Sequence, residues 1–205
     1  MARWAPDARD RLQSAALALF VESGFDQTTV AQIAERAGLN RATFFRHFTD
    51  KREVLFGGED TLTGLFAGAV RQAPVGASLA ECVRAAVLSP APLMTAQQRV
   101  RARQRMQVLA ANPEVQERGL LKHARISAAL HEALVERGFD DLAARLAAEV
   151  GLLAFRLATE RWVGAEAGNQ PFSGFADAAL ADVYERMGDL SEHTRAGRVT
   201  PGQRS

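Results

Sequence analysis

Two short helical segments joined by only three residues, Gly38 to Asn40, constrain the fold of this chain more than any other feature. Thr29 and Gln32 have the spacing of a capping box, which predicts that a helix begins there. Gly38 predicts its end, because glycine readily adopts the left-handed conformation that follows many helices. Asn40 is a favoured N-cap and predicts the start of the next helix. Two helices this close together are typical of a helix-turn-helix, which we expect over residues 29–48.

Composition and apolar spacing predict helices for the rest of the chain as well. The 205 residues are 47% hydrophobic and 24% charged, which is ordinary for a soluble globular protein. Alanine is frequent and β-branched residues are sparse, and this favours helices over strands. We expect an all-α fold of about nine helices. Besides the helix-turn-helix, the expected ranges are 7–23, a helix from Lys51, 79–89, 93–111, 114–137, 140–167 and 172–189.

The chain changes character between residues 74 and 78, where Pro, Gly and Ser mark a junction. We therefore expect an N-terminal three-helix domain over residues 7–67 and a C-terminal helical domain over residues 68–190. Residues 191–205 are polar and contain Gly, Pro and Arg, and we expect this tail to be disordered.

Positive charge is concentrated in and around the expected helix-turn-helix. The chain has a net charge of +1, but residues 36–52 contain five basic residues and a single acid, Asp50. His47 adds a possible sixth. Such a local excess suits a polyanion and predicts a double-stranded DNA partner. The basic residues are Arg36, Arg41, Arg46, Lys51 and Arg52.

The first turn of the second short helix would lie where a recognition helix meets base edges in the major groove. Arg41 can donate two hydrogen bonds to guanine. Ala42, or the methyl group of Thr43, can contact the methyl group of thymine. Arg46 and His47 are placed for phosphates or flanking bases.

Other side chains in this segment have predicted roles in packing or in phosphate binding. Thr28 and Thr29 can offer hydroxyl and backbone N–H groups to phosphate at a helix start. Phe44 and Phe48 have one-turn spacing, and we expect both to pack in the domain core. Phe45 points elsewhere, and the sequence leaves open whether it packs between domains or contacts the groove.

Lys51 is one of only two lysines, with Lys122, in a chain whose other basic residues are all arginine. We expect it at the first position of a helix, where free N–H groups and the helix dipole favour an anion. A flexible ammonium adds to such a site in a geometry that a planar guanidinium does not match. The sequence therefore predicts a phosphate contact at Lys51.

Taken together, these motifs resemble the tetracycline-repressor-like (TetR) family of transcriptional regulators. The resemblance implies a long helix from Lys51 into an all-helical C-terminal domain that dimerises and binds a small effector. It also implies DNA contacts for Thr43, His47 and Lys51. One departure is Phe45, because the family usually has Tyr there, and the phosphate-bonding hydroxyl is lost. The motifs are Thr28-Thr29-Val30 through Ile33-Ala34, Ala37-Gly38-Leu39, Thr43-Phe44-Phe45-Arg46-His47-Phe48 and Lys51.

Two sets of residues in the C-terminal half are candidates for ligand binding. The arginines of the run 99–105 could hold an anionic ligand, although at helical spacing they fall on separate faces, and a solvated or ion-paired role is favoured. An apolar set could line an effector pocket, although ordinary core packing is favoured. The first set is Arg99, Arg101, Arg103 and Arg105; the second is Met94, Met106, Phe155 and Trp162.

Apolar stripes on the last two expected helices predict a homodimer, because one domain can bury only some of these faces. A two-fold dimer would read a roughly palindromic operator. The stripes comprise Leu142, Leu146, Val150, Leu153 and Leu157, and then Phe172, Phe175, Ala179, Val183 and Met187.

We expect a ligand-responsive repressor; an activator of the same family, a small helical enzyme or carrier, and a helical interaction protein remain alternatives. No Gly-rich phosphate loop, nucleophile elbow or paired metal ligands are found, so we expect no catalytic residues, no metal and no cofactor besides an unidentified effector. His123 and His131 are expected to be ordinary core or surface residues. A single cysteine, Cys82, expected to be buried, and the lack of an apolar leader predict a cytoplasmic location away from the membrane.

Overall fold

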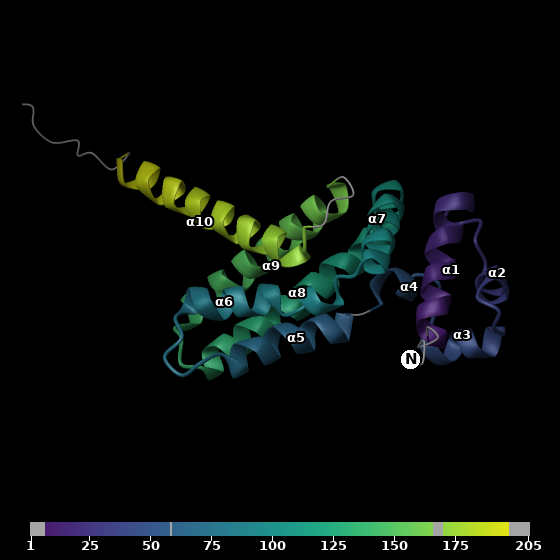
Figure 1. Ribbon diagram of the computed structural model, residues 1–205, viewed down its shortest axis with the longest axis horizontal. Coiled ribbons are helices and arrows are strands. Elements are labelled where there is room, and N and C mark those ends of the chain that lie inside the picture. Colours follow the sequence, from purple (N-terminus) through teal and green to yellow (C-terminus); the bar gives the residue numbers. More distant parts are fainter. Residues whose placement is uncertain (1–6, 58, 166–169, 197–205) are drawn as a thin grey trace, which may run out of the picture.

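The computed structural model describes residues 7–57, 59–165 and 170–196, and Figure 1 shows an elongated arrangement of helices. Within those ranges the regular elements are ten α-helices and one 3-10 helix, and none is a strand. They are α1 (Ala8–Ser23), α2 (Val30–Arg36), α3 (Arg41–His47), α4 (Glu53–Phe56), α5 (Glu59–Gln72), α6 (Leu79–Leu88), η1 (Ala91–Leu93), α7 (Ala96–Ala111), α8 (Pro113–Glu136), α9 (Asp141–Gly164) and α10 (Phe172–Ala196).

Helices α1 to α4 form a small N-terminal domain at one end of the molecule (Figure 1). Leu12 and Leu17 on α1 are fully buried in its apolar core. Phe44 on α3 and Phe48 directly after it enter the same core, with ring centroids 5.5 Å apart. The predicted packing role of these two phenylalanines is confirmed.

Local hydrogen bonds explain where the two short helices begin. Gln32 N–H donates to the Thr29 hydroxyl at 3.3 Å, and Thr29 N–H donates to Gln32 Oε1 at 2.8 Å, so the predicted capping box is confirmed. The Asn40 side chain accepts from the Thr43 N–H at 2.8 Å, as expected of an N-cap. These bonds satisfy donors that a helix start leaves unpaired.

Gly38 ends the first of these helices with a φ of 64°, a conformation that glycine adopts without strain. A Cβ atom at this position would lie 2.9 Å from the guanidinium of Arg11. That guanidinium donates to the carbonyl of Ala37 and thereby ties α1 to the end of α2. Glycine is therefore needed here for its backbone angle, whereas a Cβ atom would meet only the flexible end of the Arg11 side chain.

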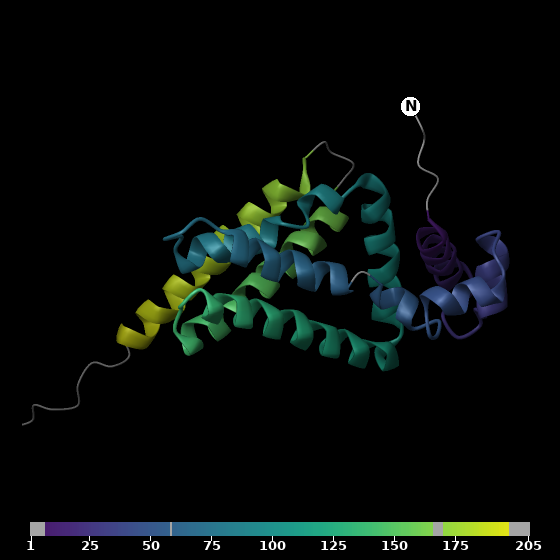
Figure 2. The same ribbon diagram turned by 90° about the horizontal axis from the view of Figure 1, so that it is seen from below.

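Helices α5, α6, α8, α9 and α10 build the larger C-terminal domain, in which α9 packs against α6, α8 and α10. Figure 2 shows α10 extending past the end of this bundle, away from the N-terminal domain. Leu130 and Ala148 are fully buried in its core. Cys82 is also fully buried there, as predicted.

Helix α7 lies between the two domains and packs against both α1 and α9 (Figure 2). Its Val108 belongs to the core of the N-terminal domain, together with Val115 at the start of α8. Its Ala102 packs instead against the core of the C-terminal domain. Helices α7 and α8 thus both connect the two cores.

The predicted long helix from Lys51 is wrong, because the chain forms two helices there, with α4 ending before Gly57. Gln13 on α1 donates to the carbonyl of Val54 at 3.2 Å, which holds α4 against α1. A Cβ at Gly57 would lie 3.0 Å from the same amide nitrogen. The split accounts for one helix more than expected. The predicted domain boundary at residue 67 falls inside α5.

Several predicted helix ends also shift. The range 93–111 begins as a 3-10 turn, and α7 itself starts at Ala96. The range 140–167 ends as α9 at Gly164, and residues 166–169 lie outside the described residues. Helix α10 runs to Ala196, so the expected disorder of the tail is wrong for residues 191–196; residues 197–205 lie outside the described residues.

Candidate nucleic-acid interface

Helix α3 has one buried face and one exposed face. Phe44 is fully buried and fixes the helix on the domain core. Arg41, Ala42 and Arg46 are exposed on the other side. Figure 1 places α3 at the edge of the small domain, away from the C-terminal bundle. The predicted base-reading turn is therefore accessible to a long ligand.

Thr43 has its hydroxyl group engaged within the protein. Its Oγ1 donates to the Asn40 side chain at 3.0 Å, and its N–H donates to the same oxygen at 2.8 Å. The side chain is half-buried. Because the hydroxyl serves the cap, the methyl group is the part of Thr43 left for a base contact, in line with the sequence-based expectation.

The aromatic side chain that departs from the family pattern is exposed. Phe45 has 51% of its surface accessible, and its ring meets that of Phe44 edge to face at 5.4 Å. The sequence left two roles open for Phe45, packing between domains and a contact in the DNA groove. Its exposure excludes packing between domains within this chain. His47 lies half-buried beside Phe48, with ring centroids 6.5 Å apart.

Fewer basic residues are left without an acidic partner than the sequence suggested. Arg36 makes a two-pronged ion pair with Glu22, at 2.5 and 2.7 Å, and this hydrogen bonding holds the pKa of Glu22 below its usual range. Arg41 and Arg46, in contrast, make no hydrogen bond or ion pair with any residue that the structure describes. The uncompensated positive charge therefore lies on α3 and at exposed Arg52, just before α4.

The two threonines before α2 differ in position. Thr28 is 2% exposed, and its hydroxyl donates to the carbonyl of Gly24 at 2.8 Å. The phosphate contact predicted for this hydroxyl is wrong, because a hydroxyl that is buried and already paired does not reach a partner outside. Thr29 is exposed at the start of α2, and its hydroxyl donates to Gln32 at 2.9 Å.

Lys51 is held by three carbonyl groups of the loop before α2. Its ammonium donates to the carbonyls of Phe25, Asp26 and Thr28 at 2.7, 3.1 and 3.2 Å. It also lies 4.5 Å from the centre of the Phe25 ring. An ammonium has three donors, and all three are used here. The side chain clamps the loop to the segment after α3.

The anion site predicted at the start of a helix from Lys51 is wrong in its geometry. Helix α4 begins at Glu53, two residues later than expected. The carboxylate of Asp50 accepts from the N–H groups of Arg52 and Glu53 at 2.7 and 2.9 Å, so it occupies that helix start. The compact ammonium of Lys51 suits three converging carbonyls and a ring, and a planar guanidinium would not match them.

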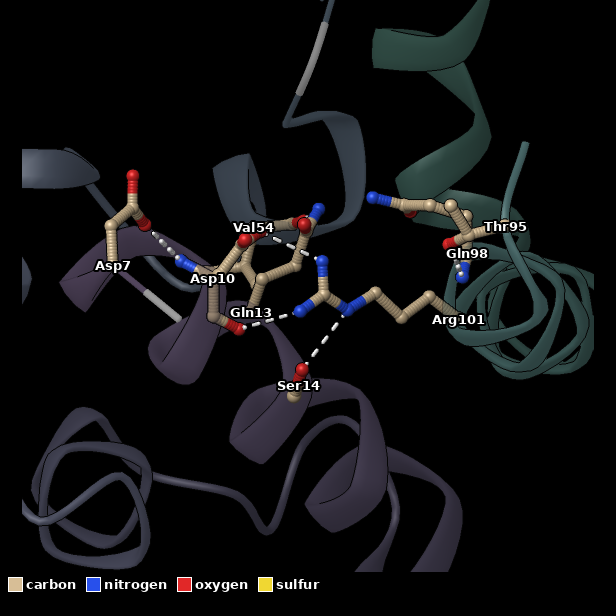
Figure 3. Close-up of polar contacts among 8 residues, drawn as sticks. All are labelled: Asp7, Asp10, Gln13, Ser14, Val54, Thr95, Gln98 and Arg101. Atoms are coloured by element: carbon tan, nitrogen blue, oxygen red, sulfur yellow. Dashed lines mark hydrogen bonds and ion pairs between the residues drawn. The ribbon is translucent and has the colours of Figure 1, made fainter. Parts of the chain in front are cut away.

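The arginine run of α7 is mostly a structural joint. Figure 3 shows Arg101 reaching from α7 to the start of α1. Its guanidinium is 3% exposed and donates to the Asp10 carboxylate at 2.8 Å, the Ser14 hydroxyl at 3.0 Å and the main-chain carbonyl of residue 10 at 3.1 Å. No sequence pattern pointed to this joint, because its partners are 87 and 91 residues away along the chain.

Two neighbours in the run bind the end of α9 instead. Arg103 donates to the carbonyl of Val163 at 2.7 Å, and Arg99 donates to the carbonyl of Ala165. Arg99 also lies over the ring of Trp162, 5.9 Å from its centre. Cations at a helix C-terminus satisfy free carbonyls and complement the helix dipole. The favoured structural interpretation therefore holds for Arg99, Arg101 and Arg103.

Two of the four residues predicted to line an effector pocket meet in one aromatic cluster. Phe155 and Trp162 both stack edge to face on Phe172, at 5.6 and 5.7 Å. Met94 is partly buried against the same core. Met106 is 38% exposed on α7 and does not join them. A pocket formed by this set stays a prediction.

Two histidines of the C-terminal domain contact acids. His123 contacts Glu149 at 3.0 Å, and His131 contacts Asp141 at 2.9 Å. Among the described residues no three His, Cys, Asp or Glu side chains gather as metal ligands would. In the same part of the chain, no helix is both long and apolar enough to cross a membrane.

Comparison with known families gives matches at both ends of the chain. Residues 12–56 match the model of bacterial regulatory proteins of the tetR family, and residues 77–188 match the MftR C-terminal domain. The regulator TcmR of Streptomyces glaucescens is 41% identical over 68 residues, which are 33% of this chain and 30% of TcmR. The mycofactocin biosynthesis regulator MftR of Mycobacterium tuberculosis is 28% identical over 113 residues, 55% of this chain and 57% of MftR. These alignments span less than two thirds of each relative.

Solved structures share the fold over nearly the whole chain. Thermus thermophilus FadR, a TetR-family repressor in complex with lauroyl-CoA, has a TM-score of 0.52 at 23% identity and covers 96% of this chain and 98% of FadR. A TetR-family regulator from Syntrophomonas wolfei has a TM-score of 0.60 at 14% identity, covering 86% of this chain and 93% of its own. At these identities the likeness describes the architecture.

An exposed cationic helix, held on the small domain of α1 to α4 beside a larger helical bundle, defines a helix-turn-helix DNA-binding regulator. The two family matches identify the family, since the match to the MftR C-terminal domain alone covers more than half of the chain. The chain belongs to the TetR family of transcriptional regulators.

Proposed function

We propose that this protein is a dimeric repressor that binds a roughly palindromic DNA operator and is released by a small-molecule effector. The observation that carries the DNA-binding part is the exposed face of α3, where Arg41 and Arg46 have no partner among the described residues. Buried Phe44 and Phe48 hold that face in one orientation. Unpaired arginines on a rigid helix suit guanine edges and phosphates.

The contacts that we propose divide into base reading and positioning. Arg41, Ala42 and the methyl group of Thr43 would read bases from the first turn of α3. Arg46, His47 and exposed Thr29 would hold the phosphate backbone. Phe45 would make an apolar contact where the family's usual Tyr offers a hydroxyl.

The larger domain supports the proposed dimer. Leu142 and Leu146 on α9 are 73% and 54% exposed, and Leu190 on α10 is 70% exposed. Other members of the predicted stripes, such as Phe172 and Val183, are buried within the chain and are not free for a partner. Two copies joined along α9 and α10 would cover the exposed leucines and present two α3 helices to one DNA duplex.

Effector release requires a connection between the larger domain and α3. Helix α7 provides this connection, because Arg103 donates a hydrogen bond to the end of α9 and Arg101 donates one to the start of α1. An effector that prefers one position of α7 would shift the separation of the two α3 helices in the dimer. The FadR structure with lauroyl-CoA is a precedent for a small ligand in this fold.

A gel-shift assay with DNA flanking the gene tests the proposal at two salt concentrations. Specific binding should weaken steeply with salt, because each neutralised phosphate releases counterions. Arg41→Ala should relax specificity at one base position, costing about 1–3 kcal/mol, whereas the matched control Arg71→Ala on the exposed surface of α5 should bind as wild type. Wild-type protein that binds no duplex specifically would rule the proposal out.

Two alternatives are kept as outcomes of functional assays. An activator would bind the same DNA and raise transcription in a reporter assay, where a repressor would lower it. A small helical enzyme or carrier would use the larger domain without needing α3, so that Arg41→Ala and Arg46→Ala would leave its activity unchanged.

A further inference from the structure

One arginine of the α7 run has no role in holding the protein together. Arg99, Arg101 and Arg103 donate to α9 or α1. Arg105, one turn after Arg101, has a buried Nε atom with no acceptor, and its guanidinium makes no hydrogen bond or ion pair with any described residue. The run therefore contains three structural arginines and one unpaired cation.

The position of Arg105 follows from the faces of α7. Arg101 faces α1, and Ala102 faces the core of the C-terminal domain. At about 100° per residue, Arg105 lies about 40° from Arg101 and about 60° from Ala102 around the helix axis. Val108 and Leu109, one turn further on, pack against the N-terminal core. Arg105 thus points into the seam where the two domains meet.

The electrostatics of this seam are unfavourable to a lone cation. Burial is the main cause that lowers the pKa of Arg105 to about 10, and the positive charge of Arg101 adds to it. At neutral pH the group is still charged, and the Asp10 carboxylate nearby already serves Arg101. Buried charges in proteins are normally paired, since desolvation without a partner is unfavourable. Only the Nε atom is fully buried and the side chain as a whole is partly exposed, so an anion from outside can reach the guanidinium.

We propose that Arg105 binds the carboxylate or phosphate group of a ligand that enters the seam between α7 and the N-terminal domain. A guanidinium offers two parallel donors that match either group. Ala102, Val108 and Leu109 on the adjoining faces are apolar, so the ligand is an acid with an apolar body. The inference rests on the proposed function only in naming this ligand as the effector.

The site also accounts for a response at the DNA-binding end. An anion on Arg105 would relieve its repulsion with Arg101, the residue that bonds α1. Binding would therefore act on the joint between α7 and the helix that carries the small domain. The ligand would favour whichever α7–α1 arrangement encloses it best.

The first arm of the test is the stability of the ligand-free protein. Arg105→Met keeps most of the side-chain length and removes the unpaired charge, so we expect its thermal midpoint to equal or exceed that of wild type. Arg71→Met, at an exposed arginine on α5, is the matched control and should change little. A clear fall in the midpoint of Arg105→Met would mean that the side chain stabilises the fold by itself, which would overturn the proposal.

The second arm compares three probes of equal chain length: decanoate, decyl phosphate and decan-1-ol. Wild type and Arg71→Met should be stabilised by at least one anion more than by the alcohol, and the better anion identifies the head group. Arg105→Met should bind that anion at least about tenfold more weakly, as expected for a lost charge-assisted hydrogen bond. Arg105→Lys should restore part of the affinity. An anion no better than the alcohol in wild type, or an equal preference in Arg105→Met, would overturn the site.

A parallel gel-shift separates this inference from the proposed function. Specific operator binding together with no Arg105-dependent anion effect would overturn the site alone. An Arg105-dependent anion effect in a protein that binds no operator would contradict the proposed function and leave the site standing.

Discussion

The ion pair between Arg101 and Asp10 is asymmetric, and the asymmetry predicts which partner matters more. The Arg101 side chain is 3% exposed, whereas that of Asp10 is 48% exposed. Removing Asp10 leaves a buried cation without its carboxylate, but removing Arg101 leaves a carboxylate that water can solvate. We therefore expect Asp10→Ala to lower the free energy of unfolding more than Arg101→Met.

The magnitudes follow from the remaining contacts. Breaking a buried pair by removing one partner costs about 3–5 kcal/mol, and we expect Asp10→Ala near about 3 kcal/mol, because the Ser14 hydroxyl still accepts from the guanidinium. Arg101→Met should cost about 1 kcal/mol, since methionine refills the space and the freed carboxylate is hydrated. The double variant should resemble Arg101→Met, which gives a coupling energy of about 3 kcal/mol.

Urea unfolding followed by circular dichroism measures this cycle on wild type, the two single variants and the double variant. The exposed pair Arg36–Glu22, with side chains 45% and 49% accessible, is the control cycle, and its coupling should be much smaller. Equal losses from the two single variants, or losses that simply add in the double variant, would refute the reasoning.

Three further predictions concern other parts of the chain. Lys51→Met should lower the free energy of unfolding by about 2 kcal/mol, since three carbonyls lose a charged donor, and should change the salt slope of DNA binding by less than about one; a full unit of change at unaltered stability would restore the phosphate role. Leu146→Glu should shift sedimentation from dimer to monomer while the circular dichroism stays helical, and an unchanged dimer would place the interface elsewhere. Hydrogen bonding from Ser127, and then from His123, holds the pKa of Glu149 below its usual range. This contribution is present above the unfolded pKa of about 4.3 and is lost as pH falls through the folded value, so Ser127→Ala should show a shallower loss of stability between about pH 5 and pH 3 in urea titrations.

The features that could be read from the sequence are those made within a few residues. The capping box at Thr29 and the cap at Asn40 depend on side chains that reach three residues along the chain. The burial of Phe44 and the exposure of Arg41 follow from the helical repeat once the inward face is known. The same repeat placed the candidate DNA-reading face correctly on the outside of α3.

The predictions that were wrong failed because of contacts that the local sequence pattern does not show. Thr28 has the right chemistry and the right sequence position for phosphate, but its side chain is buried against Gly24. The helix predicted from Lys51 has no proline to stop it, yet it breaks at Gly57, where Gln13 of α1 approaches closely. In each case a partner distant along the chain, or a turn of the backbone, overrode a local preference.

By itself the sequence determined the all-helical character of the chain, the helix-turn-helix, its caps and its cationic outer face, because these follow from short-range hydrogen bonding and helical periodicity. Only the tertiary structure decided which partners the individual charged side chains bind. It tied Lys51 to carbonyls 23 to 26 residues away and Arg101 to Asp10 91 residues away, and it left Arg105 unpaired. A long cationic side chain can serve many partners, and the packing of distant helices determines which of them lie within reach.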